Sequence, residues 1–201
     1  MNLESSHSKR VVVIAGPAGS GKNSVVRDIM GRCSNCVRLV TATTRAMRSG
    51  ERDGVDYYFF TPERFDEKVA SGNIPEHRFV PALNVLYGTY LPDLKKRLAE
   101  KNTVIFATVD IEGARYLKDN YNATTIFIMP ESVEQFEGRL KVRNPEWSDG
   151  EFRVRQEITE KELQAHAEQY DYRVVNADGE LEETVDEIIA ILKKEGYNLV
   201  A

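Results

Sequence analysis

Short runs of apolar residues recur along the chain, and each is followed by a longer segment with helical periodicity. The runs lie at residues 10–15, 103–109, 124–129 and 172–175, and the helical patterns lie at 22–32, 91–101, 111–119, 132–143, 150–170 and 181–194. A continuous apolar run that ends at turn residues is typical of a strand buried on both faces of a sheet. Strands that alternate with helices in this way predict an α/β fold with a parallel sheet covered by helices.

Residues 41–89 interrupt this alternation. They are rich in glycine, tyrosine, phenylalanine and charged residues, and they hold short strand-like pieces, DYYFF and LYGTY, around one predicted helix at 62–71. We therefore expect an inserted mixed α/β lobe at 41–89 within a single unit that spans 1–201. The parallel core is expected at 10–40, 90–138 and 156–201.

Composition narrows the class of protein. With 201 residues, of which 41% are hydrophobic and 29% charged, the chain can bury one sizeable core. No apolar run approaches the roughly 20 residues that span a bilayer, and residues 1–10 lack the hydrophobic centre of a signal peptide. We therefore expect a cytoplasmic protein without membrane contact. The formal charge of -5, from 32 acidic and 27 basic residues, disfavours nucleic acid as a partner.

The two cysteines, Cys33 and Cys36, stand in the order CSNC. A zinc site would need two further ligands at suitable spacing, and no matching cysteine or histidine pair follows. We expect reduced thiols near a helix end, and a redox-active pair is the alternative.

The stretch GPAGSGKNS, at residues 16–24, connects the first apolar run to the first predicted helix. A GxxxxGK loop in this position presents successive backbone N–H groups and a helix N-terminus to an anion, and the lysine adds a charge. The order of strand, loop, lysine and helix favours a triphosphate site over a ligand-free glycine turn. The candidate ATP-binding residues are Gly16, Ala18, Gly19, Ser20, Gly21, Lys22, Asn23 and Ser24.

Asn23 stands where this loop usually has a serine or threonine, whose hydroxyl ligates magnesium. The hydroxyl comes one position later, at Ser24. An asparagine carbonyl can ligate a hard cation, and Mg²⁺ keeps several waters and leans on substrate phosphates. We expect Asn23 to be a weak metal contact that acts mostly through water and phosphates.

The stretch TTRAMRSGERDGVDY, at residues 43–57, resembles the acceptor-binding segment of guanylate kinases. The resemblance extends over most of the chain through three further motifs: the glycine-rich loop at 16–24, which we call the P-loop, Tyr87-Gly88-Thr89, and DIEGA at 110–114. Four ordered motifs are more specific than any one of them. The resemblance implies a P-loop NTPase-type fold, ATP and GMP as substrates, and Mg²⁺ as cofactor.

Four side chains in or near this segment offer donors to a monophosphate. The paired N–H groups of an arginine guanidinium and the hydroxyl of a tyrosine can donate hydrogen bonds to phosphate oxygens. The candidates are Arg45, Arg48, Tyr57 and Tyr87. Surface arginines paired with Glu51 or Asp53 are the alternative.

A carboxylate matches the ring N–H and the exocyclic amine of guanine, whereas adenine presents an acceptor at the same place. The resemblance assigns the reading of the base to Glu76, Asp110, Thr41 and Thr89. The link from Glu76 to the Tyr87-Gly88 pair, in PEHRFVPALNVLYGT, is longer than usual for the family, and a widened or reshaped base pocket is one expectation.

The resemblance also places Arg139, Arg143 and Arg155 in a helical lid at 139–155, and Asn176 near the donor adenine. Phosphoryl transfer depends on alignment and positive charge, which Lys22, Arg45 and the lid arginines would supply. The acceptor is itself an anionic oxygen, so no catalytic base is required. Thr108 stands where similar kinases often have an acid that assists magnesium, so the metal is held mainly by phosphates and water, or turnover is slow.

The interpretation is a guanylate kinase, with the reaction ATP + GMP giving ADP + GDP, as a monomer or homodimer. One alternative is a kinase of another small phosphorylated acceptor. The other is a non-catalytic nucleotide- or peptide-binding module of the same family, which would generally lack the P-loop lysine and the lid arginines.

Overall fold

The computed structural model describes residues 9–17, 19–143, 148, 150, 152, 153, 157 and 167–201. Its larger sheet has five strands in the order β2-β7-β1-β8-β9, and every neighbouring pair is parallel. The four predicted apolar runs all form strands of this sheet. The strands are β1 Val11–Ala15, β2 Cys36–Arg38, β7 Val104–Ala107, β8 Thr124–Pro130 and β9 Tyr172–Asn176.

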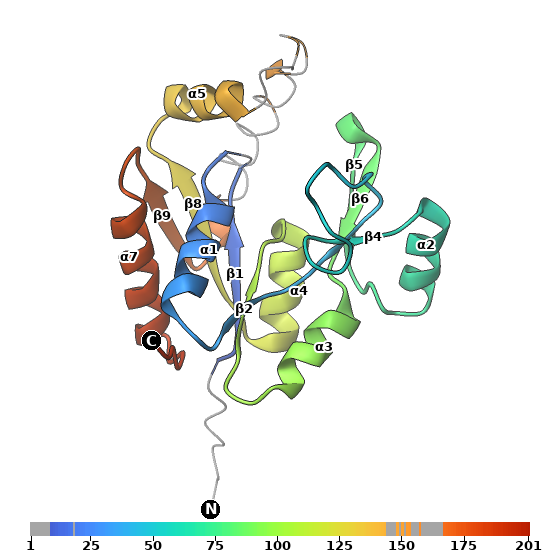
Figure 1. Cartoon of the computed structure of the whole chain (residues 1–201), viewed down its shortest axis with the longest axis horizontal. Coiled ribbons are helices and arrows are strands. Elements are labelled where there is room, and N and C mark those ends of the chain that lie inside the picture. Colours follow the sequence, from blue (N-terminus) through green and yellow to red (C-terminus); the bar gives the residue numbers. More distant parts are fainter. Residues whose placement is uncertain are drawn as a thin grey trace, which may run out of the picture.

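Helices cover both faces of this sheet (Figure 1). Successive side chains of a strand point to opposite faces, so Val12 and Ile14 join one apolar cluster while Val11 and Val13 join the other. The first cluster lies under α1 Lys22–Arg32 and α7 Leu181–Lys194, and the second lies under α3 Leu91–Ala99 and α4 Ile111–Tyr121. The predicted α/β fold with a covered parallel sheet is confirmed. A further helix, α5 Val133–Arg143, follows β8 beyond the carboxyl end of the sheet (Figure 1).

A second, four-stranded sheet is built from residues within 41–89. Its order is β4-β3-β6-β5, and a small separate core of Ala42, Phe65 and Ile74 lies against it. The elements are β3 Ala42–Thr43, β4 Tyr58–Phe59, α2 Pro62–Ala70, β5 His77–Val80, the 3₁₀ helix η1 Pro81–Leu83 and β6 Val85–Gly88. We call residues 41–89 the acceptor lobe. The exact division of the chain into core, lobe and lid stays a prediction.

Several elements were not predicted from the sequence pattern, among them strands β2, β3 and β5. Strand β2 was not expected, because it has three residues and two of them are only half buried; its pairing with β7 holds it in the sheet. Most of the helix predicted at 150–170 lies outside the described residues, and the part that is described contains the 3₁₀ helix η2 Ala167–Gln169.

The cysteines are free, as predicted, and both are buried, with Cys33 at the C-terminal cap of α1 and Cys36 in β2. Burial and the neighbouring Cys33 raise the pKa of Cys36 to about 12. A thiolate is therefore disfavoured, which argues against a redox-active pair. The described residues contain no cluster of histidine, cysteine and acidic side chains that could hold a metal ion.

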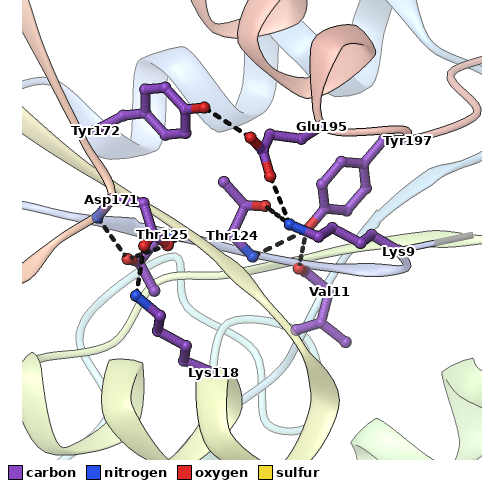
Figure 2. Close-up of polar contacts among 9 residues, drawn as sticks. All are labelled: Lys9, Val11, Lys118, Thr124, Thr125, Asp171, Tyr172, Glu195 and Tyr197. Carbon is purple, nitrogen blue, oxygen red and sulfur yellow. Dashed lines mark hydrogen bonds and ion pairs between the residues drawn. The ribbon is translucent and has the colours of Figure 1, made fainter.

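The C-terminal segment fastens the amino end of the sheet. The hydroxyl of Tyr197 accepts a hydrogen bond from the backbone N–H of Thr124, 2.9 Å away, and donates one to the carbonyl oxygen of Val11 (Figure 2). Lys9 bridges the Thr124 hydroxyl and the Glu195 carboxylate beside it (Figure 2). These contacts tie β1 and β8 to the chain that follows α7.

A second group in Figure 2 ties β8 to the start of β9. The Asp171 carboxylate accepts from the backbone N–H and the hydroxyl of Thr125, both at 2.9 Å, and pairs with Lys118 of α4. Both groups lie at the amino ends of the strands, whereas the P-loop follows the carboxyl end of β1. Ligands of open parallel sheets bind at the carboxyl ends of the strands, so these polar residues are structural.

Candidate functional site

The loop between β1 and α1 can adopt its conformation only with glycine at its key positions. Gly16 and Gly21 have φ of 140° and 92°. A Cβ on Gly16 would lie 2.4 Å from the carbonyl oxygen of Ile128, and one on Gly21 would lie 2.2 Å from Nδ2 of Asn176. Gly21 caps α1 without any side-chain hydrogen bond. The first N–H groups of α1 are therefore left for an anion.

A pocket of about 340 Å³ opens beside this loop. Two cationic side chains line it, Lys22 from α1 and Arg139 from α5. Lys22 Nζ donates to the carbonyl oxygens of Gly16 and, at 2.7 Å, Pro17, so the lysine lies over the loop. The residues that line the pocket are Gly19, Gly21, Lys22, Asn23, Ser24, Arg139, Asn176, Ala177, Gly179 and Leu181.

The side-chain oxygens that could ligate a metal ion near this pocket are neutral amide and hydroxyl oxygens, not a group of carboxylates. Asn23 is exposed and Ser24 is half buried, and both line the pocket. The hydroxyl oxygen of Thr108 is buried and has no hydrogen-bond partner among the described residues. Amide and hydroxyl oxygens suit a hard cation that keeps its waters and binds substrate phosphates. The residues therefore fit Mg²⁺ that arrives with a nucleotide.

In the acceptor lobe, Arg45 and its partners order the loop at 45–51. The Arg45 guanidinium pairs with Glu51 at 2.8 Å and lies 5.5 Å from the centre of the Tyr57 ring. Glu51 also accepts from the backbone N–H of Arg48 at 2.8 Å, and Arg45 lowers the pKa of this carboxyl. The rings of Tyr57 and Tyr87 lie 6.0 Å apart. Three predicted phosphate ligands thus lie together, and the predicted alternative pairing with Glu51 occurs as well.

The predicted base-reading carboxylates meet where the lobe approaches α4. Oε1 of Glu76 accepts from the backbone N–H of Thr89 at 3.0 Å, and it would lie 3.1 Å from a Cβ on Gly113. Asp110 caps α4 and accepts from the N–H of Gly113 at 3.1 Å. Gly113 therefore adjoins both acids. Thr41 and Thr89, the other predicted base ligands, are buried.

Burial disfavours the ionised form of both Glu76 and Asp110. It raises the pKa of Glu76 to about 7, with a contribution from the nearby charges of Asp110 and Glu112 and against the hydrogen bond from Thr89. Burial also raises the pKa of Asp110. A site that must hold two carboxylates together favours a ligand that donates hydrogen bonds to both.

The predicted lid and adenine residues are partly described. Arg139, in α5, pairs with Asp178, and its Nη2 donates to the carbonyl oxygen of Asn176 at 3.1 Å. Asn176 is buried and lines the pocket, but its side chain also donates to the Ser20 carbonyl oxygen at 2.8 Å. Ala18, Arg155 and the side chain of Arg143 lie outside the described residues.

Comparisons with known proteins agree with this geometry. The family model described as "Guanylate kinase" matches residues 8–195. The chain belongs to the guanylate kinase family. It is 37% identical over 181 residues to the guanylate kinase of Chlorobaculum tepidum, and the match covers 89% of each chain. It is 38% identical over 189 residues to the guanylate kinase of Syntrophotalea carbinolica, and that match covers 92% of this chain and 85% of the relative.

Solved structures extend the agreement. The guanylate kinase of Anaplasma phagocytophilum has a TM-score of 0.71 and 30% identity, with 95% of this chain and 88% of that chain covered. The SH3-kinase fragment of tight junction protein 3 has a TM-score of 0.53 at 13% identity, with 97% and 61% covered, which shows the shared fold alone. Membership of the guanylate kinase family makes this chain an ATP-dependent nucleoside monophosphate kinase. Among the described residues, no helix combines the length and apolarity that a bilayer crossing requires.

The longer link of this guanylate kinase family member forms a β-hairpin. His77 pairs with Gly88 at one end of it and Val80 pairs with Val85 at the other. The connecting turn passes through η1 and ends at Asn84, which has a φ of 52°. The turn lies at the end of the hairpin remote from Glu76, so the structure accommodates the link away from the predicted base pocket.

Arg78 was not among the predicted site residues. It lies directly across from Tyr87 in the hairpin, and its Nη1 is 3.9 Å from Oδ2 of Asp110. Side chains of directly opposed residues share one face of a sheet, so Arg78 and Tyr87 lie on the same side of the lobe. The arginine lowers the pKa of Asp110 against the effect of burial. Residues two apart in an extended segment share one face, so the spacing from Glu76 to Arg78 could have indicated that Arg78 lies near the predicted base pocket.

Proposed function

We propose that this chain transfers the γ-phosphoryl group of ATP to GMP, giving ADP and GDP. The observation that carries the proposal is the meeting of Glu76, from the acceptor lobe, with Asp110, at the start of α4. Two half-buried acids at one place suit the paired N–H donors of guanine, and adenine would leave them facing an acceptor. A site built to hydrogen-bond a polar edge rejects an analogue without it by about 10⁴-fold.

The donor phosphates would bind the P-loop N–H groups, Lys22 and Arg139. These groups neutralise charge that spreads over the transferring phosphoryl group, and they act by position rather than by proton transfer. Asn23 and Ser24, which line the pocket, would hold Mg²⁺ through their side-chain oxygens and through water, and the ion would supply further positive charge to the donor phosphates. We propose that the lid residues Arg143 and Arg155 add positive charge at the donor phosphates.

The acceptor phosphate would bind Arg45, Arg48, Tyr57 and Tyr87. The Glu51 carboxylate pairs with the Arg45 guanidinium at 2.8 Å, and a phosphate would compete for the same N–H donors. The attacking oxygen of GMP is already anionic, so the proposed mechanism includes no base. Closure of the lobe and lid would exclude water and suppress hydrolysis of ATP. We also propose a cytoplasmic location and a monomer or homodimer.

The test is a coupled assay of ADP production with Mg-ATP and GMP, dGMP, AMP, UMP, CMP or IMP at equal concentration. GMP is expected to give the fastest turnover. Faster turnover of another acceptor would replace the proposal by a related kinase activity. GMP binding by calorimetry without turnover would support a non-catalytic binding module. The presence of Lys22 and Arg139 in one pocket favours the enzyme.

A further inference from the structure

The turn between β9 and α7 holds Arg139 through a carboxylate that has no assigned role. Oδ1 of Asp178 accepts from Nε of Arg139 at 2.9 Å and from Nη2 at 2.6 Å. Nη2 also donates to the carbonyl oxygen of Asn176 at 3.1 Å. Three contacts from one turn therefore fix two of the three nitrogens of the guanidinium.

The same turn is tied to the P-loop. Nδ2 of Asn176 donates to the carbonyl oxygen of Ser20 at 2.8 Å, and Oδ1 of Asn176 accepts from the buried hydroxyl of Thr184 at 3.3 Å. The side chain packs so closely on the loop that a Cβ on Gly21 would overlap it. The P-loop, the turn and the guanidinium of Arg139 thus form one connected unit.

The third guanidinium nitrogen of Arg139, Nη1, could donate a hydrogen bond to a ligand. Nη1 is buried and has no hydrogen-bond partner among the described residues. A buried charged N–H group without a partner is costly. Arg139 lines the same pocket as Lys22 and the start of α1, which is the place proposed for the donor phosphates. A phosphate oxygen at that place would complete the donors of the guanidinium.

We propose that Asp178 is a positioning residue for the donor site: it orients the Arg139 guanidinium so that Nη1 binds a phosphate oxygen of the nucleotide. The inference rests on the proposed function for its kinetic readout. Asp178 is not among the residues that line the pocket, and it acts through Arg139. The Asp178 side chain is 71% exposed, and exposed ion pairs contribute about 0–1 kcal/mol to stability. Its role is therefore orientation rather than stabilisation of the fold.

The chain contains a matched control in Asp186. Its carboxylate pairs with Arg32 at 2.7 Å, and its side chain is 72% exposed, close to the value for Asp178. Asp186 lies in α7 and is not among the residues of the pocket. Asp186→Asn therefore removes an equivalent exposed charge and ion pair without touching the proposed donor site.

Asp178→Asn is expected to lower kcat about tenfold with KM for GMP unchanged, because misplaced catalytic groups cost rate rather than acceptor binding. Mg-ATP binding by calorimetry is expected to weaken severalfold. Asp186→Asn is expected to match the parent in both. In an Arg139→Ala background, which itself should lose activity, Asp178→Asn is expected to add nothing, because residues that act through one another are not additive.

Three outcomes would overturn the proposal. Asp178→Asn could match Asp186→Asn in turnover and in ATP affinity, it could raise turnover because the carboxylate holds Arg139 away from the phosphates, or it could keep its effect in the Arg139→Ala background. Failure of the proposed function is distinguishable, since the parent would then show no GMP-dependent turnover. Calorimetry with Mg-ATP would still decide on Asp178 in that case.

Discussion

The affinity for the acceptor is expected to depend on pH through Glu76. Burial raises the pKa of this carboxyl to about 7, where the nearby acids Asp110 and Glu112 oppose its ionisation and the N–H of Thr89 supports it. Nη1 of Arg78 lies 3.9 Å from Oδ2 of Asp110. Guanine offers only N–H donors to this position, so the ionised carboxylate is the form that binds it.

The magnitude follows from the ionised fraction. With a pKa of about 7, roughly one eleventh of Glu76 is ionised at pH 6 and roughly ten elevenths at pH 8, and apparent affinity scales with the competent fraction. KM for GMP is therefore expected to fall about tenfold between pH 6 and pH 8. Because Glu76 and Asp110 interact, the observed midpoint belongs to the pair.

The assay measures initial rates of ADP formation against GMP concentration at saturating Mg-ATP, from pH 6 to pH 8. Glu76→Gln is the matched control, because it cannot ionise at this position while the phosphate of GMP, with a second pKa of about 6, still titrates. At pH 8 the variant should raise KM for GMP roughly 10- to 100-fold, the equivalent of a hydrogen bond to a charged group. A pH dependence shared equally by parent and variant would refute the reasoning.

Three further results are expected. Lys22→Ala should lower turnover by at least about 100-fold with GMP binding retained, because the lysine acts on the transferring phosphoryl group; unchanged turnover would contradict the P-loop site. Tyr197→Phe should lower the free energy of unfolding in urea by about 1–3 kcal/mol, since two buried backbone groups lose their partner. Tyr172→Phe, whose hydroxyl meets the half-exposed Glu195, should cost less than about 1 kcal/mol. A disulfide reagent at pH 8 should modify Cys36 at least about tenfold more slowly than in the unfolded chain, because burial restricts access and raises the pKa of the thiol; equal rates would show that the thiol is accessible.

The elements of the central sheet could be predicted from the sequence because their signals are local. A strand buried on both faces is mostly apolar, as β1 and β7 are throughout and β8 is after its first two threonines. The edge strand β9 keeps a shorter apolar signal in the residues between Tyr172 and Asn176. The P-loop could be predicted for the same reason: glycine spacing and Lys22 encode backbone conformation and charge within a few residues. Strand β2 carries no such signal, since its place comes from pairing with β7.

The partners of each functional side chain could be known only from the tertiary structure. Arg45 was predicted as a phosphate ligand, but its pairing with Glu51 was one of two open alternatives. Nothing in the local pattern indicates that Arg78 meets Asp110 or that Asp178 meets Arg139. Residues distant in sequence become neighbours through packing of whole elements, and a linear pattern reports the burial and backbone preference of each element but not which other element will face it.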